Sequence, residues 1–378
     1  MMMLLEQKIK NTGQKKILTL DGGGIRGMIT VEVLGKIESL LRKELGKGDD
    51  FVLADYFDYI SGTSTGAIIA AALSLGWSVD KIRGFYINSG AKMFDKANLL
   101  KRFKYKYEDE ALQKLLSDEF GEKTTLGSSD LKTLLMMVMR NASTDSPWPV
   151  SNNPGAKYND KSRSDCNLNI PLWQLVRAST AAPVYFPPEK VSVGDQDFVF
   201  VDGGITMYNN PSFQTFLMAT LEPYKLCWET GEDKMLIISL GTGTSPSANL
   251  ELAPGDMNLI YNASSIPSAL MFAALNEQDL LCRTFGKCLH GEELDREVGD
   301  LFCEVDQANF TSPVDPRLFT YCRFNAELTR SGLDKLGLND LKPENVQKLD
   351  SVEYIEDLQQ IGHAVGSQVS ARHFAGFL

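Results

Sequence analysis

The sequence predicts an α/β protein, in which the strands of a buried sheet alternate with helices. Lys15–Leu20 is a short apolar run that we expect to form a buried strand, and a glycine-rich loop follows it at residues 21–27. Residues 28–45 place apolar side chains at helical spacing and complete a strand–loop–helix unit. The runs 198–201 and 235–240 also end in glycine-bearing loops. Because ligands of such sheets gather at the carboxyl ends of strands, we expect the functional site there.

The other elements follow from apolar spacing and from turn residues. We expect further helices at residues 67–75, 79–94, 108–120, 171–182, 209–221, 264–285 and 344–362, and further strands at 57–60, 130–140, 301–305 and 319–324. Residues 141–169 are rich in Ser, Asn, Asp and Pro, so we expect a surface loop, with a lid or substrate-entrance flap as its functional interpretation. The basic and aromatic stretch 101–107 is either a solvated face or a contact for lipid headgroups.

Composition and charge fit a globular protein with an ample core. Of the 378 residues, 43% are hydrophobic and 23% are charged. The formal charge of −11 disfavours a nucleic-acid polymer as the main partner, because phosphates would be repelled. No apolar run approaches the roughly 18 residues that span a bilayer, and the first residues lack the apolar core of a signal peptide. We therefore expect a cytoplasmic protein that is peripheral to the membrane when it acts there.

The cysteines predict neither disulfides nor a metal site. No two of the six form a Cys-x-x-Cys pair, and none shows metal-ligand spacing, so they indicate free thiols in a reducing compartment. They are Cys166, Cys227, Cys282, Cys288, Cys303 and Cys322.

Residues 62–66 form the pattern Gly-x-Ser-x-Gly between a β-prone run and a helix, with Ser64 at the centre. This is the layout of a nucleophile elbow, in which glycines permit a sharp bend and close packing around the serine. The serine hydroxyl then lies above the N-terminus of the next helix, which stabilises developing negative charge. The elbow residues around the serine are Gly62, Thr65 and Gly66. Since so short a pattern arises by chance, its surroundings must decide.

The glycine-rich loop allows two interpretations. Gly22, Gly24 and Gly27 fit the G-x-G-x-x-G pattern of dinucleotide-binding folds. That pattern needs an acidic residue at the end of a second strand about 20 residues on, a position that here falls in the polar turn 45–50. The fingerprint also does not require Arg26. Backbone N–H groups offered to a developing oxyanion are a better use of three successive glycines.

A serine nucleophile needs a group that removes its proton. The three histidines, His290, His363 and His373, lie in a polar turn, in a terminal helix and close to the chain end, and none follows an expected strand. Asp202 does follow one, with two glycines after it. Burial raises the pKa of a carboxyl group and would make Asp202 a better base. A turn-forming Asp-Gly-Gly is the alternative interpretation.

Three motifs, in order, then resemble one family. They are Asp21-Gly22-Gly23-Gly24-Ile25-Arg26-Gly27, Gly62-Thr63-Ser64-Thr65-Gly66 and Asp202-Gly203-Gly204. Two accessory strings, 181–188 and Asn209-Asn210-Pro211, fall where expected. Over roughly residues 16–243 the chain strongly resembles the patatin-like phospholipases, and more loosely beyond.

The resemblance implies a three-layer α/β/α fold with a central, mostly parallel sheet, and a Ser-Asp dyad that works without histidine, metal or cofactor. Ser64 would be the nucleophile and Asp202 the general base of acyl-ester hydrolysis through an acyl-serine intermediate. The N–H groups of the glycine loop, chiefly those of Gly23 and Gly24, would form the oxyanion hole, with Arg26 fixing the loop. Gly22 and Gly27 complete that loop, and Gly203 and Gly204 the base motif.

The resemblance also divides the chain and implies its partners. We expect residues 1–15 to be a lead-in, 16–243 the catalytic core, and 244–378 a continuation of the same domain with a regulatory or oligomerisation role. The implied substrate is a membrane phospholipid, a galactolipid or another lipid acyl ester, reached by transient contact with the membrane surface. Some similar bacterial proteins are antiviral defence effectors switched on by cyclic nucleotides, so a small nucleotide is a candidate activator. The alternatives are a nucleotide-binding oxidoreductase and a non-catalytic storage or scaffold protein.

Overall fold

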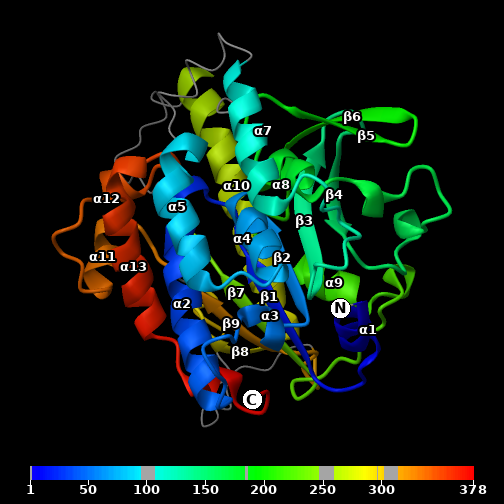
Figure 1. Ribbon diagram of the computed structural model, residues 1–378. Helices are drawn as coiled ribbons and strands as arrows, with labels where there is room; N and C mark the ends of the chain where they lie inside the picture. The colour runs from blue at the N-terminus through cyan, green and yellow to red at the C-terminus, as the bar shows by residue number, and fades with distance from the viewer. Residues whose placement is uncertain (1, 95–106, 184–185, 247–258, 296, 302–313) are drawn as a thin grey trace.

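The computed structural model describes residues 2–94, 107–183, 186–246, 259–295, 297–301 and 314–378. Over these residues the chain forms a nine-stranded mixed sheet with helices packed on both of its faces (Figure 1). The strand order is β5-β6-β3-β2-β1-β7-β9-β8, and β4 pairs with β3 outside this path. The six strands β3, β2, β1, β7, β9 and β8 run parallel to one another, which confirms the expected layered α/β fold with a mostly parallel sheet.

The strands are β1 Lys15–Leu20, β2 Tyr59–Thr63, β3 Leu134–Asn141, β4 Ser146–Ser151, β5 Glu189–Val193, β6 Gln196–Asp202, β7 Met235–Leu240, β8 Lys287–His290 and β9 Thr320–Phe324. The helices are α1 Met2–Lys10, α2 Gly27–Glu44, α3 Leu53–Tyr56, α4 Thr65–Ser74, α5 Val79–Phe94, α7 Tyr107–Phe120, α8 Leu172–Ser179, α9 Ser212–Thr220, α10 Leu259–Phe285, α11 Arg330–Lys335, α12 Pro343–Val346 and α13 Ile355–Ser367.

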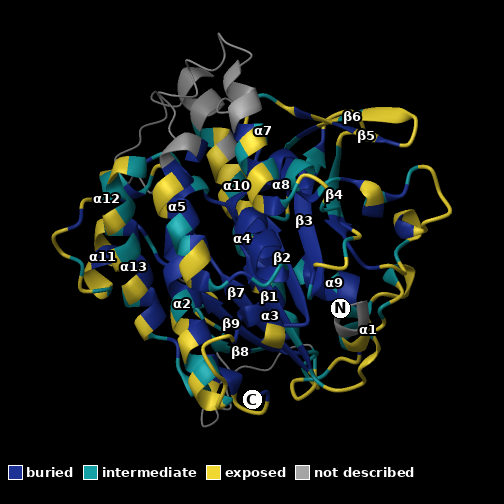
Figure 2. Cartoon of the chain, in the orientation of Figure 1, coloured by how far each residue is buried: buried dark blue, intermediate teal, exposed yellow. Residues whose placement is uncertain are grey.

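The central strands are apolar along their whole length because both faces of the sheet are covered. In β1, Leu18 and Leu20 pack into the core beneath α2, α4 and α13, whereas Ile17 faces the smaller core beneath α9 and α10. The same alternation divides the side chains of β2, β3 and β7 between the two cores. Figure 2 shows the resulting buried band through the sheet, with exposed residues on loops and outer helix faces.

β2 and β6 lie end to end along one edge of β3. β2 runs parallel to β3 as far as Thr63, which lies opposite Val138. β6 runs antiparallel, and its last residue, Asp202, lies opposite Met139. β4 occupies the other edge of β3 over the same positions. The carboxyl ends of β2 and β6 therefore meet head to head, which brings Ser64, the residue after β2, to Asp202.

Several local predictions were wrong or incomplete. Residues 146–151 of the expected loop form β4, and β5 was not predicted. The helix expected at 344–362 is broken into α12 and α13. Residues 302–305 of one expected strand and 101–106 of the basic and aromatic stretch lie outside the described residues.

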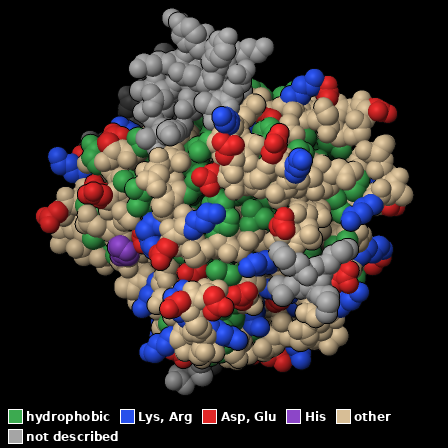
Figure 3. All heavy atoms as spheres, in the orientation of Figure 1, with side chains coloured by type: hydrophobic (Ala, Val, Ile, Leu, Met, Phe, Trp, Pro, Cys, Tyr) green, Lys and Arg blue, Asp and Glu red, His purple; other side chains and the backbone are tan. Residues whose placement is uncertain are grey.

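Among the residues that the structure describes, no helix is both long enough and apolar enough to cross a bilayer. On the face drawn in Figure 3, acidic and basic side chains are interspersed and do not gather by sign. The net charge of −11 is therefore not concentrated on that face.

A buried ion network fixes the start of the glycine-rich loop. Asp21 directly precedes the loop, and its carboxylate accepts hydrogen bonds from Arg323 of β9, with Nη2 2.6 Å from Oδ2. The Arg323 guanidinium also lies 3.6 Å from the carboxylate of Asp279 on α10. Asp279 is also paired with Arg283, whose Nη2 lies 2.7 Å from Asp279 Oδ2. Because Asp21 and Arg323 are both buried, removal of Arg323 would leave the Asp21 carboxylate in the core without its cation.

We therefore expect Arg323→Met to lower the free energy of unfolding by roughly 3–5 kcal/mol, as measured by urea denaturation. The control is Lys10→Met, since Lys10 forms an exposed ion pair with Glu6, and we expect a loss of about 1 kcal/mol or less there. Equal losses in the two variants would contradict the assignment of a structural role to the buried network.

Candidate active site

Ser64 lies at a sharp turn between β2 and α4, and its backbone is strained. Its φ of 54° and ψ of −122° are unusual for a residue with a side chain. Glycine is needed on both sides, because a Cβ at Gly62 would lie 2.0 Å from the Gly66 carbonyl oxygen. A Cβ at Gly66 would lie 2.2 Å from the carbonyl oxygen of Leu20. The elbow is therefore held against β1 by backbone packing.

The structure brings Ser64 and Asp202 into direct contact. Ser64 Oγ donates a hydrogen bond of 2.6 Å to Asp202 Oδ2. The other carboxylate oxygen accepts the N–H of Gly204 at 2.6 Å. Both side chains are buried, with Ser64 9% and Asp202 5% exposed. Two hydrogen bonds thus fix the carboxylate with one oxygen directed at the serine hydroxyl.

Burial raises the pKa of Asp202 to about 6, because the charged form loses its hydration. The hydrogen bonds from Ser64 and Gly204 favour the carboxylate and oppose part of this shift. Asp202 is therefore ionised at neutral pH, yet more basic than an ordinary aspartate. That combination suits proton transfer near pH 7.

The glycine-rich loop lies against the elbow. Thr242 Oγ1 donates a 2.8 Å hydrogen bond to the Gly22 carbonyl, and a Cβ at Gly22 would approach the Ser64 Cβ to 3.2 Å. Gly24 has a φ of +60°, which glycine adopts without strain. The N–H groups of Gly23 and Gly24 have no hydrogen-bond partner among the residues that the structure describes. Two such donors, in a loop that packs against the serine through Gly22, are the groups that an oxyanion site requires.

Arg26 and Gly27 close the loop and start α2. The Arg26 guanidinium donates through Nη1 to the Gln347 carbonyl at 3.2 Å, and burial lowers its pKa to about 10. The neighbouring Ile25 N–H donates to the Leu349 carbonyl at 3.0 Å. Residues between α12 and α13 thus support the loop from the C-terminal part of the chain.

Sequence reasoning gave no role to two residues that complete the site. Ser179, the last residue of α8, accepts the Ser64 N–H at 3.0 Å and donates to the Val138 carbonyl at 2.5 Å. The Ser179 hydroxyl thus satisfies the Val138 carbonyl at the point where β2 ends and no longer pairs with β3. Asn209 accepts the Gly22 N–H through its carbonyl at 3.2 Å. Asn209 belongs to the accessory string Asn209-Asn210-Pro211, whereas no sequence signal marks Ser179.

The histidines lie elsewhere, although one premise about them was wrong. His290 ends strand β8 and is not in a turn, and its Nε2 lies 3.1 Å from Gln368. β8 lies at the far end of the sheet from β6, and the five strands β3, β2, β1, β7 and β9 separate the two. His363 contacts Glu32 at 3.0 Å, and His373 packs against His290. Within the described part of the chain, no group of three His, Cys, Asp or Glu residues is placed to hold a metal ion.

The fold and the site together define a class: a layered α/β protein with a serine at a strand–helix elbow in contact with one carboxylate. The chain matches the Patatin-like phospholipase family over residues 18–215, just over half of its 378 residues. The chain belongs to this family.

Individual relatives match over part of their length. Patatin-17 of Solanum cardiophyllum is 29% identical over 254 residues, which cover 61% of this chain and 60% of that protein. A cGAMP-activated phospholipase of Vibrio cholerae is 31% identical over 218 residues, covering 55% of this chain and 58% of that one. The mouse 85/88 kDa calcium-independent phospholipase A2 is 29% identical over 248 residues, 61% of this chain and 27% of that one. The chain thus aligns with at most about 60% of these relatives.

Among solved structures, VipD from Legionella pneumophila is similar with a TM-score of 0.37 and 16% identity. The match covers 92% of this chain and 67% of that one.

The raised pKa of Asp202 predicts that this residue lowers stability at neutral pH. The folded protein keeps the proton up to about pH 6, whereas an unfolded aspartate releases it near pH 3.8. Stability therefore falls as the pH rises through this window. We expect Asp202→Asn to be more stable than wild type at pH 8, by about 2–3 kcal/mol, with the difference vanishing below about pH 4. Urea denaturation at both pH values measures this, and a pH-independent difference would contradict it.

Ser179→Ala removes the acceptor of the Ser64 N–H and the donor to Val138. Because both groups are buried, we expect a loss of about 1–3 kcal/mol in the free energy of unfolding. Ser367→Ala is the control, because its hydroxyl is on the surface, and we expect almost no change. An unchanged free energy of unfolding in Ser179→Ala would show that the elbow does not depend on this hydroxyl.

Proposed function

We propose that the chain is a lipid acyl hydrolase that cleaves carboxylic esters of membrane glycerolipids through Ser64 and Asp202. The observation that carries this proposal is the 2.6 Å hydrogen bond from Ser64 Oγ to Asp202 Oδ2 at a strained elbow. Family membership supports the reaction class.

In the first step, Ser64 Oγ attacks the ester carbonyl carbon as its proton passes to Asp202 Oδ2. The carbonyl oxygen becomes an oxyanion, which the Gly23 and Gly24 N–H groups stabilise. The tetrahedral intermediate collapses, the C–O bond to the alcohol breaks, and Asp202 returns the proton to the departing oxygen. The products are the free alcohol, which is the lysolipid, and an acyl-serine.

In the second step, water replaces the alcohol. Asp202 removes a proton from water as the hydroxide oxygen attacks the acyl carbon, and the same N–H groups hold the second oxyanion. Collapse breaks the bond to Ser64 Oγ, which regains the proton from Asp202. The fatty acid leaves, and both residues return to their starting states without a metal or cofactor.

The substrate class rests on relatives and on surface chemistry. Two relatives are named as phospholipases, one of them as a phospholipase A2. Exposed apolar side chains on α10, Ile266, Leu270 and Phe272, suit transient contact with a lipid surface. We expect the protein to visit membranes and not to span them.

A second proposal is that a small nucleotide activates this hydrolysis. The similarity to a phospholipase that is named as cGAMP-activated favours it. A role in bacterial defence would follow from such activation.

The alternatives have less support. A dinucleotide-binding oxidoreductase needs an acidic residue at the end of the second strand, but β2 ends at Thr63 and is followed by Ser64. A Cβ at Gly23 would also lie 2.1 Å from Thr242 Oγ1, so Thr242 already fills the space beside that glycine. A storage or scaffold protein with this fold would not need a hydroxyl paired with a buried carboxylate.

Ser64→Ala should abolish release of fatty acid from a mixed lipid extract, measured by mass spectrometry, because no other group would form the acyl intermediate. A fluorophosphonate probe should label wild type and not this variant. The control is Ser367→Ala, which should keep full activity. Undiminished turnover by Ser64→Ala would exclude the dyad, and absence of both labelling and turnover in wild type would favour the scaffold alternative.

Activity should depend on the ionised form of Asp202. We expect kcat/KM for a soluble ester to fall about tenfold per pH unit below about pH 6, where the carboxyl group becomes protonated. Above that pH the rate should level off. Asp202→Asn should lose most of the activity and also this acid limb, and a limb that survives in the variant would assign it to another group.

A further inference from the structure

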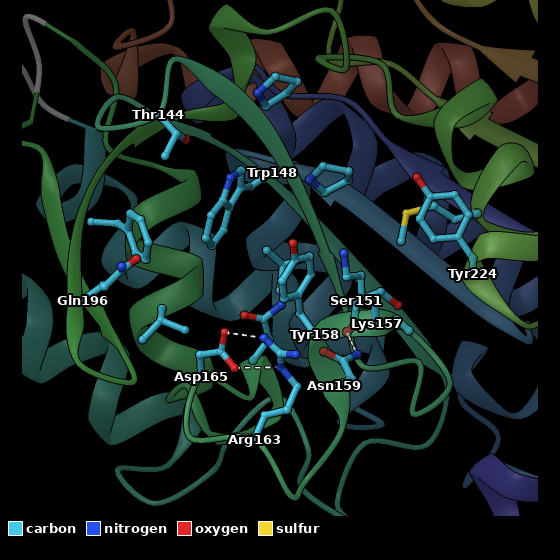
Figure 4. A pocket seen from close by; sticks show the side chains of 18 of the residues that line it. Thr144, Trp148, Ser151, Lys157, Tyr158, Asn159, Arg163, Asp165, Gln196 and Tyr224 are labelled. Carbon is cyan, nitrogen blue, oxygen red and sulfur yellow. Dashed lines mark hydrogen bonds and ion pairs between the residues drawn. The ribbon is translucent and has the colours of Figure 1, made fainter.

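A large cavity lies along β4, on the opposite edge of β3 from Asp202, and is not explained by ester hydrolysis. Its volume is about 1060 Å³, and neither Ser64 nor Asp202 lines it. Its walls come from β4, the β5–β6 hairpin, residues 156–167 and the segment after α9 (Figure 4). Much of it is built from the stretch 141–169, which the sequence predicted as a loop or lid.

Aromatic side chains from four segments line this cavity: Trp148, Tyr158, Phe198 and Tyr224. The Trp148 ring is held in place by Phe198 and Phe200, each 5.2 Å away between ring centroids. Tyr158 is 50% exposed, so one part of its ring is open to a ligand. Rings of this kind bind flat aromatic groups by stacking.

Two cations lie next to Tyr158. Lys157 Nζ is 5.3 Å and the Arg163 guanidinium 5.4 Å from the centre of its ring. Figure 4 shows Arg163 paired with Asp165, to which it donates two hydrogen bonds of 2.7 Å. Lys157 forms no ion pair with any residue that the structure describes. The Lys157 ammonium beside the aromatic side chains is thus available to an anion. The exposed carboxylate of Asp195, between β5 and β6, also lines the cavity and offers a hydrogen-bond acceptor.

The wall is pinned in place by buried side chains. Asn159 donates from Nδ2 to the carbonyls of Ser151 and Asn153, at 2.7 and 2.6 Å. Asn153 in turn donates to the carbonyl of Tyr224 at 2.5 Å. These bonds tie the segment between β4 and α8 to the segment after α9. The cavity therefore exists before a ligand arrives, which lowers the entropic cost of binding.

Flat apolar side chains, hydrogen-bonding groups and one available cation match the chemistry of a nucleotide. An acyl chain would make no polar contact with the Lys157 ammonium, nor with Asn167 and Gln196, which also line the cavity. The volume exceeds what one base and its phosphate need and is large enough for a dinucleotide. We propose that this cavity binds a nucleotide, with a base stacked on Trp148 or Tyr158 and a phosphate at Lys157.

The position of the cavity links it to the dyad, and this part rests on the proposed function. Trp148 lies opposite Met139 on one edge of β3, and Asp202 lies opposite Met139 on the other. Phe198 also belongs to β6, the strand that ends at Asp202. A ligand that shifts Trp148 or Phe198 therefore acts on the base through a single strand. The nucleotide regulates hydrolysis by changing how Asp202 meets Ser64.

Binding is tested by titration calorimetry with cGAMP, GMP, inorganic phosphate and phosphocholine as separate probes. We expect cGAMP or GMP to bind, with affinity reduced roughly tenfold or more in Lys157→Ala and in Tyr158→Ala. Both side chains are exposed, so these variants should fold. Lys47→Ala, which changes an exposed lysine at the end of α2, is the matched control and should bind as wild type does.

The inactive Ser64→Ala protein separates this proposal from the proposed function, because it should bind the nucleotide without turnover. Binding by phosphocholine alone would assign the cavity to a lipid headgroup and overturn the proposal, as would absence of binding by both nucleotides. Unchanged nucleotide affinity in both Lys157→Ala and Tyr158→Ala would place the ligand elsewhere. In wild type, bound nucleotide should change kcat for a soluble ester severalfold, and an unchanged kcat would overturn the link to Asp202.

Discussion

The meeting of β2 and β6 on one edge of β3 is the constraint on which the candidate site depends. A parallel strand and an antiparallel strand share that edge, and their carboxyl ends point at each other. Ser64 and Asp202 are the residues at that junction, and they are far apart in the chain. Their contact is thus set by hydrogen-bond register, and the junction leaves backbone groups that Ser179 satisfies. The glycine-rich loop, which we propose as the oxyanion site, follows β1, the neighbour of β2.

The strained backbone of Ser64 and the burial of the Asp202 carboxylate both lower the stability of the folded state. Close packing around the elbow and hydrogen bonds to the carboxylate hold these two residues in place. Gly62 and Gly66 leave no room for the elbow to relax, because backbone carbonyls occupy the space of a side chain. Asp202 keeps its ionised form through two hydrogen bonds instead of a cation. A cation at that position would lower the pKa of Asp202 and make it a poorer base. The nearby ion network of Asp21 and Arg323 serves the scaffold instead.

Motifs within short stretches of sequence predicted the parallel strands and the candidate site residues. Contacts between residues that are distant in the chain could not be predicted in this way. Lys15–Leu20 and the elbow are written in contiguous residues, so apolar runs and glycine spacing were enough. β4 was not predicted because it contains Pro147 and Pro149, and prolines usually argue against a strand. β4 tolerates them because it pairs along the edge of β3. The sequence placed His290 in a turn because β8, the strand that it ends, is only four residues long and its partner β9 lies about 30 residues further along the chain. The role of Ser179 depends on where β2 ends, which no sequence pattern shows.

The short pairing between β3 and β6 also affects how such a chain can change over evolution. Asp202 is placed by three residue pairs, from Met139 opposite Asp202 to Asn141 opposite Phe200. Residues 142–195 connect β3 to β6, and after them the chain forms these three pairs with β3. That stretch can therefore gain or lose residues, and with them new pockets, while the geometry at Ser64 stays constant. Diversity in this part of the molecule is compatible with an unchanged reaction centre.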